Sequence, residues 1–244
     1  MDLRGKVAIV TGASRGIGKA IVLELARAGA HAVIAARSER DIRDVADEVR
    51  RLGAESLPLR TDVTRESDVQ DMVKQAIDRL GRVDVLVNNA GLMGRETPFL
   101  ETALEDWDAI VQSNLYGAFI CARAVAPHMV RQGSGAIINI TSGAAVRTGF
   151  LNVPYGVAKA GMDRLTLGIA AELTEKGVAC VSLSPPTTDT ETVRAIYPDR
   201  DVPSWAAPPE LTARALRLLL EEGPLEHSGK VVSVREYLRG LGQL

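Results

Sequence analysis

VAIVTGASRGIG, from Val7 to Gly18, is the stretch of sequence that decides the fold. Apolar and β-branched residues up to Thr11 predict a buried strand, which Gly12 interrupts. An apolar-periodic segment then runs from about Ile17 to Ala28 and is closed by a further glycine. The stretch therefore predicts a strand, a glycine turn and a helix.

The three glycines of this turn have separate uses. Gly12 allows a tight turn, Gly16 lets the backbone approach a pyrophosphate, and Gly18 lets the helix pack close to the strand. The helix N-terminus would present free N–H groups and a positive dipole end to phosphates. The spacing is G-x-x-x-G-x-G rather than G-x-G-x-x-G, and an ordinary strand-to-helix loop is the alternative. Its position after an N-terminal strand favours a dinucleotide site.

Composition excludes several classes of partner. Of the 244 residues 46% are apolar, 25% are charged and 4% are aromatic, and the net charge is −2. Without a polybasic run or base-stacking aromatics, we expect no nucleic acid and no membrane as partner. Cys121 and Cys180 lie in apolar segments without ligand spacing, which predicts buried thiols and no metal site. No leader or membrane-spanning run is evident, so we expect a cytoplasmic protein.

Strand-like and helix-like segments alternate along the whole chain. We expect an α/β fold: a single-domain (1–244) Rossmann-type doubly wound parallel sheet of about seven strands with helices on both faces. Pro58 puts its strand at a sheet edge. After the first strand we expect strands at 31–35, 56–60, 84–88, 136–141, 178–184 and 230–234. After the first helix we expect helices at 38–52, 66–80, 104–131, 154–176 and 209–220, and a loop at 187–207.

The end of the second strand bears on the choice of cofactor. An acid there would take ribose hydroxyls, whereas an arginine accommodates a 2′-phosphate. Arg37 stands there, with Arg15 in the glycine turn and no carboxylate, which favours NADP(H) over NAD(H). The alternative is a merely solvated Arg37. Asp62, after the third strand, could accept from an adenine amino group or cap the next helix.

Small polar residues follow the fourth strand. Asn88-Asn89-Ala90-Gly91 predicts a tight loop at a strand's carboxyl end, where doubly wound sheets bind ligands. Its amides can tie neighbouring loops together as well as line a cofactor. Asn114 lies inside the 104–131 helix, where asparagine is a poor choice, so it marks either a kink or chemistry.

Tyr155 and Lys159 stand four residues apart and share one face of a helix. An ammonium near a phenol favours the phenolate, so we expect a lowered pKa for Tyr155, suited to proton transfer. The alternative is an ordinary Tyr–Lys pair at the surface.

Together these residues resemble the short-chain dehydrogenase/reductase family, in its 3-oxoacyl-carrier-protein reductase-like branch. The resemblance spans nearly the whole chain, to about Val234. The motifs that carry it are Thr11-Gly12-x-x-x-Gly16-x-Gly18, Asn88-Asn89-Ala90-Gly91, Asn114, Ser142 thirteen residues before Tyr155, and Tyr155-x-x-x-Lys159.

The resemblance implies hydride transfer between NADP(H) and a small-molecule substrate, with interconversion of a ketone and a secondary alcohol. Tyr155 would be the general acid and base, and Ser142 would donate to the substrate oxygen. Lys159 would hold the nicotinamide ribose, and Asn114 a water that links Lys159 to solvent. The implied cofactor-binding residues are Gly12, Ser14, Arg15, Gly16, Ile17, Gly18, Arg37, Asp62, Val63, Asn89, Ala90, Gly91, Tyr155, Lys159, Pro185, Thr188 and Thr190.

Two departures from the family pattern remain. Pro186 replaces a glycine near the nicotinamide, and the tail after Val234 differs where the family forms subunit contacts; the resemblance still implies a homo-oligomer, a dimer or tetramer. The altered loop keeps a second function open, a catalytically silent nucleotide sensor or scaffold. We expect an apolar substrate pocket with 187–207 as its lid. Its candidate walls are Met93, Val146, Phe150, Leu151, Ile196, Tyr197, Val202 and Trp205.

Overall fold

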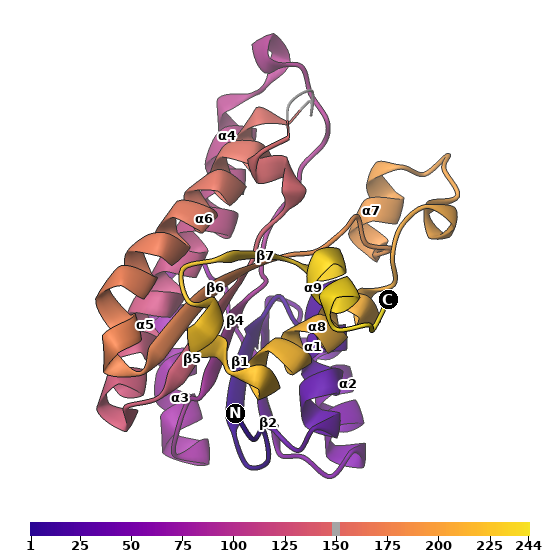
Figure 1. Cartoon of the computed structure of the whole chain (residues 1–244). Coiled ribbons are helices and arrows are strands. Elements are labelled where there is room, and N and C mark those ends of the chain that lie inside the picture. The colour runs from indigo at the N-terminus through magenta and orange to yellow at the C-terminus, as the bar shows by residue number, and fades with distance from the viewer. Residues whose placement is uncertain (148–151) are drawn as a thin grey trace.

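The computed structural model describes residues 1–147 and 152–244, and its centre is one parallel sheet (Figure 1). The strand order in the described chain is β3-β2-β1-β4-β5-β6-β7, with every pairing parallel. The strands are β1 (Val7–Thr11), β2 (His31–Ala36), β3 (Ser56–Arg60), β4 (Val85–Asn88), β5 (Gly135–Ile140), β6 (Val178–Ser184) and β7 (Val231–Ser233). The predicted fold class is confirmed.

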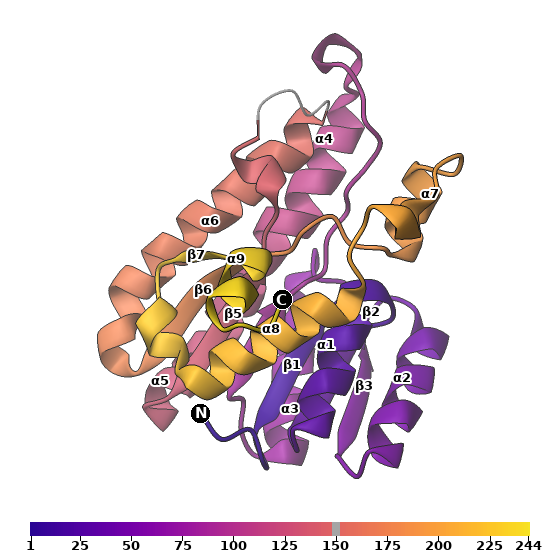
Figure 2. The same ribbon diagram turned by 45° about the vertical axis from the view of Figure 1, so that its right-hand side comes forward.

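Helices cover both faces of the sheet (Figures 1 and 2). They are α1 (Gly16–Arg27), α2 (Glu39–Arg51), α3 (Glu66–Leu80), α4 (Leu104–Val111), α5 (Gly117–Gln132), α6 (Val153–Leu173), α7 (Glu191–Ile196), α8 (Pro209–Glu222) and α9 (Val234–Gly240). One core cluster joins the sheet to α1, α2, α8 and α9, and the other joins it to α3, α5 and α6. Because both faces are covered, the central strands are mostly apolar, and Asn139 of β5 and Ser182 of β6 are buried among them.

The chain order creates a switch point between β1 and β4. From β1 the chain adds β2 and β3 on one side, and it then crosses to β4 on the other. The loops diverge at the carboxyl ends of these two strands, where ligands bind in open α/β sheets. At the outer edge, β3 pairs with β2 alone and carries Pro58, as predicted.

Three sequence predictions about elements were wrong. The single helix expected at 104–131 is divided by a π-helical segment, Gln112–Tyr116. The loop expected at 187–207 contains α7 and a 3₁₀ turn, Val202–Ser204; six helical residues are too few to show a period. Val234 begins α9 rather than ending a strand, because the Ser233 hydroxyl accepts from the Glu236 N–H and caps a new helix.

Two segments rise beyond the carboxyl edge of the sheet. Figure 1 shows α4 and the start of α6 on one side of this region and α7 on the other. In the described parts of the chain no helix is both long enough and apolar enough to cross a bilayer.

Candidate active site

A cleft of about 750 Å³ opens at the carboxyl ends of the central strands. It brings together all four predicted catalytic residues, which are Asn114, Ser142, Tyr155 and Lys159. Of the other predicted cofactor-binding residues, its walls include Ile17, Asn89, Gly91, Pro185, Thr188 and Thr190. Gly12, Ser14, Arg15, Gly16, Gly18, Arg37, Asp62, Val63 and Ala90 are not part of this lining and lie in the loops that follow β1, β2, β3 and β4, or at the start of α1.

The glycine turn is packed too closely to carry side chains. Gly12 has φ +64°, and a Cβ there would lie 2.8 Å from the Cα of Ala90. A Cβ on Gly18 would lie 2.4 Å from the Gly12 carbonyl oxygen. Asn89 fixes the turn through its Nδ2, which donates to the carbonyls of Thr11 (2.9 Å) and Gly12 (3.1 Å). The prediction that an asparagine amide ties neighbouring loops together is confirmed.

Arg37 and Asp62 lie at neighbouring strand ends. The Asp62 Oδ1 accepts from the N–H (3.0 Å) and the hydroxyl (2.8 Å) of Thr64. Burial raises the pKa of Asp62, but these bonds and the Arg37 charge outweigh it, so the pKa is lowered. Asp62 closes the turn before α3, whereas Arg65 occupies the N-cap, so the capping alternative for Asp62 was wrong in detail.

Asn114 lies in the π-helical segment and is fully buried. Its Nδ2 donates to the carbonyls of Leu92 (2.7 Å) and Ile110 (2.9 Å). Its Oδ1 is buried without a hydrogen-bond partner among the residues described. A Cβ on Gly91 would lie 2.3 Å from this oxygen, which explains the glycine. π-bulges are frequent at functional sites, and a buried unused acceptor fits a site for water.

Ser142 and Tyr155 meet at the end of β5. The Ser142 Oγ accepts from the Ala144 N–H at 3.2 Å, in the 3₁₀ turn Gly143–Ala145, and lies within hydrogen-bonding reach of the Tyr155 phenol. Burial raises the pKa of Tyr155, and the Ser142 hydroxyl opposes this rise without cancelling it. The expected lowering of this pKa was therefore wrong, because desolvation of the phenolate dominates.

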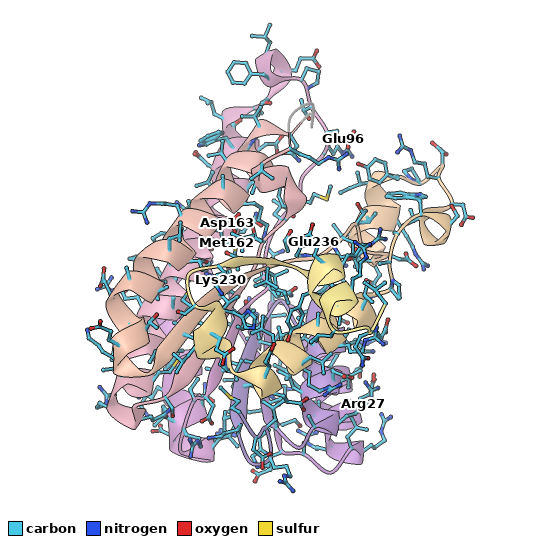
Figure 3. All side chains as sticks on the ribbon, in the orientation of Figure 1. Arg27, Glu96, Met162, Asp163, Lys230 and Glu236 are labelled. Atoms are coloured by element: carbon cyan, nitrogen blue, oxygen red, sulfur yellow. The ribbon has the colours of Figure 1, made fainter. Side chains whose placement is uncertain are left out.

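Lys159 is buried beneath Tyr155, with 4% of its surface exposed. Its Nζ lies 5.5 Å from the Tyr155 ring centroid and donates to the Ile140 carbonyl at 2.8 Å. Burial lowers the pKa of Lys159 to about 8, and the negative charge of Asp163 partly opposes this. Asp163 lies one turn further along α6 (Figure 3). The alternative of an ordinary surface pair is excluded.

Two threonines form local hydrogen bonds in the segment after β6. The Thr188 hydroxyl donates to the Pro186 carbonyl at 2.8 Å, and the Thr190 hydroxyl caps α7 by accepting from the Val193 N–H at 3.3 Å. A Cβ on Gly16 would lie 3.1 Å from the Thr190 side chain, so this segment touches the glycine turn. Both prolines line the cleft.

The expected substrate walls are confirmed only in part. Met93, Tyr197 and Trp205 line the cleft, whereas Ile196 and Val202 do not and Val146 is 85% exposed. Phe150 and Leu151 lie outside the described residues. The cleft also contains residues that the sequence did not indicate, because no motif marks them. They are Glu96, Arg147, Thr192, Val193 and Arg200.

The chain belongs to the short-chain dehydrogenase family, whose model matches residues 6–201. It is 41% identical over 184 residues to the 3-oxoacyl-[acyl-carrier-protein] reductase of Synechocystis sp., covering 75% of this chain and 74% of that one. It is 42% identical over 200 residues to human dehydrogenase/reductase SDR family member 1, covering 79% of this chain and 63% of that one. The chain is thus a short-chain dehydrogenase/reductase enzyme of the 3-oxoacyl-carrier-protein reductase-like branch.

A solved structure gives the same result for the fold. The structure of 7α-hydroxysteroid dehydrogenase complexed with NADH and 7-oxo glycochenodeoxycholic acid superimposes with a TM-score of 0.88 at 31% identity. The match covers 95% of this chain and 94% of that chain.

Proposed function

We propose that this enzyme interconverts a ketone and a secondary alcohol with NADP(H), and that Tyr155 transfers the proton. The observation that carries the proposal is the convergence of Asn114, Ser142, Tyr155 and Lys159 in one cleft, with the phenol beside the Ser142 hydroxyl. These side chains come from three separate parts of the chain: the π-helical segment, the end of β5 and α6.

A dinucleotide fits the residues along the carboxyl edge. The glycine turn leads into the N-terminus of α1, where no side chain of the N-cap residue Arg15 caps the helix, so the N–H groups there would be available to a pyrophosphate. Asp62 and Val63 would lie at the adenine, Asn89 to Gly91 at the ribose side, and Pro185, Thr188 and Thr190 at the nicotinamide end. Arg15 and Arg37 would bind a 2′-phosphate, since guanidinium pairs well with phosphate. When bound, the nicotinamide supplies or accepts the hydride.

The chain itself moves the proton. In reduction, Tyr155 donates its phenolic proton to the carbonyl oxygen, and in oxidation it takes the proton from the alcohol. Its raised pKa keeps the phenol protonated at neutral pH, which is the form an acid requires. Ser142 donates a hydrogen bond to the oxygen on which negative charge develops.

Lys159 and Asn114 support this proton transfer. With a pKa of about 8, Lys159 is mostly an ammonium at neutral pH, and it stabilises the phenolate left after proton donation. It would also hold the nicotinamide ribose hydroxyls. The unused Oδ1 of Asn114 would hold a water that returns protons from solvent to Lys159.

The test replaces the acid. With NADPH and a panel of ketones, Tyr155→Phe should lower turnover at least about a hundredfold, the scale of losing a general acid. NADPH affinity, measured by fluorescence titration, serves as the control for an intact cleft and should change far less. Unchanged turnover would remove Tyr155 from the mechanism.

A catalytically silent nucleotide sensor is the second candidate, favoured by the unusual Pro186 segment in the cleft wall. NADPH binding without any loss of absorbance across the ketone panel would favour it.

For either function we propose a cytoplasmic homo-oligomer. Exposed apolar side chains on α5 and α6, namely Phe119, Val157 and Leu167, support the assembly.

A further inference from the structure

Two arginines line the cleft without a carboxylate partner. Arg147 and Arg200 are exposed, and neither forms an ion pair with any residue in 1–147 or 152–244. Other surface arginines do pair with a nearby acid, as Arg194 does with Asp189. Arg15 and Arg37, which we assign to the cofactor phosphate, do not line the cleft. Arg147 and Arg200 are therefore available for a different ligand.

Arg147 is attached to the wall that carries Ser142. Its N–H donates to the Gly143 carbonyl at 3.0 Å, at the end of the short turn that begins after Ser142. Its positive charge also reaches the phenol of Tyr197, which comes from the opposite wall. Arg147 therefore lies between the reacting end of the cleft and the segment that follows α7.

Arg200 lies on the opposite wall. Its guanidinium lies 4.7 Å from the centroid of the Tyr197 ring, and this ring meets Trp205 edge-on with centroids 5.9 Å apart. A guanidinium over a ring keeps its N–H edge free for a planar acceptor. This wall thus offers an aromatic surface beside a cationic group.

The single carboxylate among the lining residues already has a partner. Glu96, on the segment after β4 (Figure 3), accepts a hydrogen bond from the Tyr197 hydroxyl. The remaining charged side chain of the lining, Lys159, donates inward to a backbone carbonyl. Cationic side chains thus outnumber anionic ones in the cleft lining.

We propose that the substrate is a ketone, or the corresponding alcohol, that carries a carboxylate remote from the reacting carbon. Arg147 and Arg200 bind the carboxylate, and Tyr197 and Trp205 contact the apolar part of the molecule between the two groups. Guanidinium groups match a carboxylate in shape and charge, and hydrogen bonds to charged groups are about twice as strong as neutral ones. This inference rests on the proposed ketone reductase function and names its substrate class.

The test compares matched substrates. Methyl ketones with a terminal carboxylate, in a series of chain lengths, are assayed with NADPH beside their methyl esters. At the best chain length, kcat/KM for the acid should exceed that for the ester at least about tenfold, mainly through KM. In the Arg147→Gln/Arg200→Gln double variant the acid-to-ester ratio should fall close to one. In Arg95→Gln, an exposed neighbour of Glu96 outside the cleft lining, the ratio should persist.

The outcomes separate the two proposals. If ketones are reduced but the ratio is near one at every chain length, or is unchanged in the double variant, the carboxylate proposal is overturned and the reductase stands. If no ketone is reduced, the reductase proposal fails. The carboxylate proposal is then tested by measuring how tightly acids and esters bind. In a Trp107→Phe background, Trp205 is the sole tryptophan, and its quenching should show tighter binding of acids than of esters. Equal quenching would overturn the proposal.

Discussion

Tyr155 and Lys159 lie one helical turn apart on α6, and burial shifts their pKa values in opposite directions. It raises the pKa of the phenol and lowers that of the ammonium to about 8. Both shifts favour the neutral form, since each group loses hydration when it is charged. At neutral pH the cleft therefore holds a protonated phenol above a lysine whose pKa lies close to that pH.

Lys159 should lower the stability of the fold at neutral pH. Its pKa falls from 10.5 to about 8, and at 1.36 kcal/mol per unit the buried ammonium costs roughly 3 kcal/mol. Lys159→Met also loses the bond to the Ile140 carbonyl, worth about 1 kcal/mol. We expect the variant to be more stable by about 1–2 kcal/mol at pH 7, measured by chemical denaturation.

The gain in stability from Lys159→Met should depend on pH. Below about pH 8 both folded and unfolded Lys159 are protonated, so the full cost is present. Between about pH 8 and 10.5 the folded side chain is neutral and the unfolded one is still charged, so the cost declines as pH rises. The gain of Lys159→Met should fade over this range, and a gain that stays constant to pH 10 contradicts the assignment. Lys176→Met, at an exposed position, is the control.

Arg37 should set the choice of cofactor. The wild-type enzyme is expected to bind NADPH at least about tenfold more tightly than NADH, because a guanidinium–phosphate pair is lost with NADH. Arg37→Asp should invert this preference, since an acid suits free ribose hydroxyls. Fluorescence titration measures both affinities. Arg51→Asp makes the same charge change at the far end of α2 and should leave the preference intact. Equal wild-type affinities would refute the NADP(H) proposal.

At the scale of elements, the π-helical segment places Asn114 in the wall of the cleft. It divides the helix expected at 104–131, and the Nδ2 of Asn114 donates to the carbonyls of Ile110 in α4 and of Leu92 on the loop after β4. Gly91, on the loop after β4, packs directly against the Oδ1 of Asn114. The π-helical segment and the loop after β4 are thus fitted to each other by one amide and one missing side chain.

Gly91→Ala should disturb this contact. The added Cβ would lie 2.3 Å from the Asn114 Oδ1, so the amide must move. We expect a loss of 1–3 kcal/mol in stability, as for overpacking, and a clear fall in turnover. Gly91→Ala/Asn114→Ala removes the clash and should recover stability but not turnover. Recovery of both by the double variant would exclude Asn114 from the mechanism. Gly240→Ala, where the new Cβ meets nothing within 4 Å, is the control.

The elements show where sequence patterns suffice and where they do not. Buried strands, the edge strand with Pro58 and the glycine turn could be predicted, because each depends on local period or backbone conformation. The π-helical segment could not, since the contacts of Asn114 with the loop after β4 leave no local pattern in the sequence. The place of Glu96 in the cleft also escaped prediction, because it meets Tyr197 across a separation of 101 residues. The pKa of Tyr155 was misjudged because burial is a property of the folded chain.

At the scale of the whole molecule, two core clusters enclose the sheet, and each holds side chains that no solvent reaches. Cys121 on α5 and Cys180 on β6 belong to the same cluster and are fully buried, which raises the pKa of each thiol to about 12. Thiol and thiolate chemistry at these positions therefore requires the core to open.

The thiols should report the integrity of this core. With a chromogenic disulfide reagent at pH 8, the native protein should react at least about a hundredfold more slowly than the chain in guanidinium chloride, where both thiols react. A saturating cofactor should slow the native reaction further if opening of the core releases it. Rapid stoichiometric labelling of the native protein would contradict the packing described here.

The two ends of the segment 187–207, which contains α7, are joined by backbone hydrogen bonds. Thr188 and Ala207 form a parallel bridge, the Asp189 N–H donates to the Ala207 carbonyl at 2.8 Å, and the Ala207 N–H donates to the Thr187 carbonyl at 2.9 Å. These bonds hold the ends of the segment together whatever residues lie between them. A longer or shorter loop between the same two ends changes the free energy of folding only slightly. Natural divergence or protein engineering can therefore exchange the intervening residues as one unit, and with them one wall of the cleft, while Ser142, Tyr155 and Lys159 keep their positions.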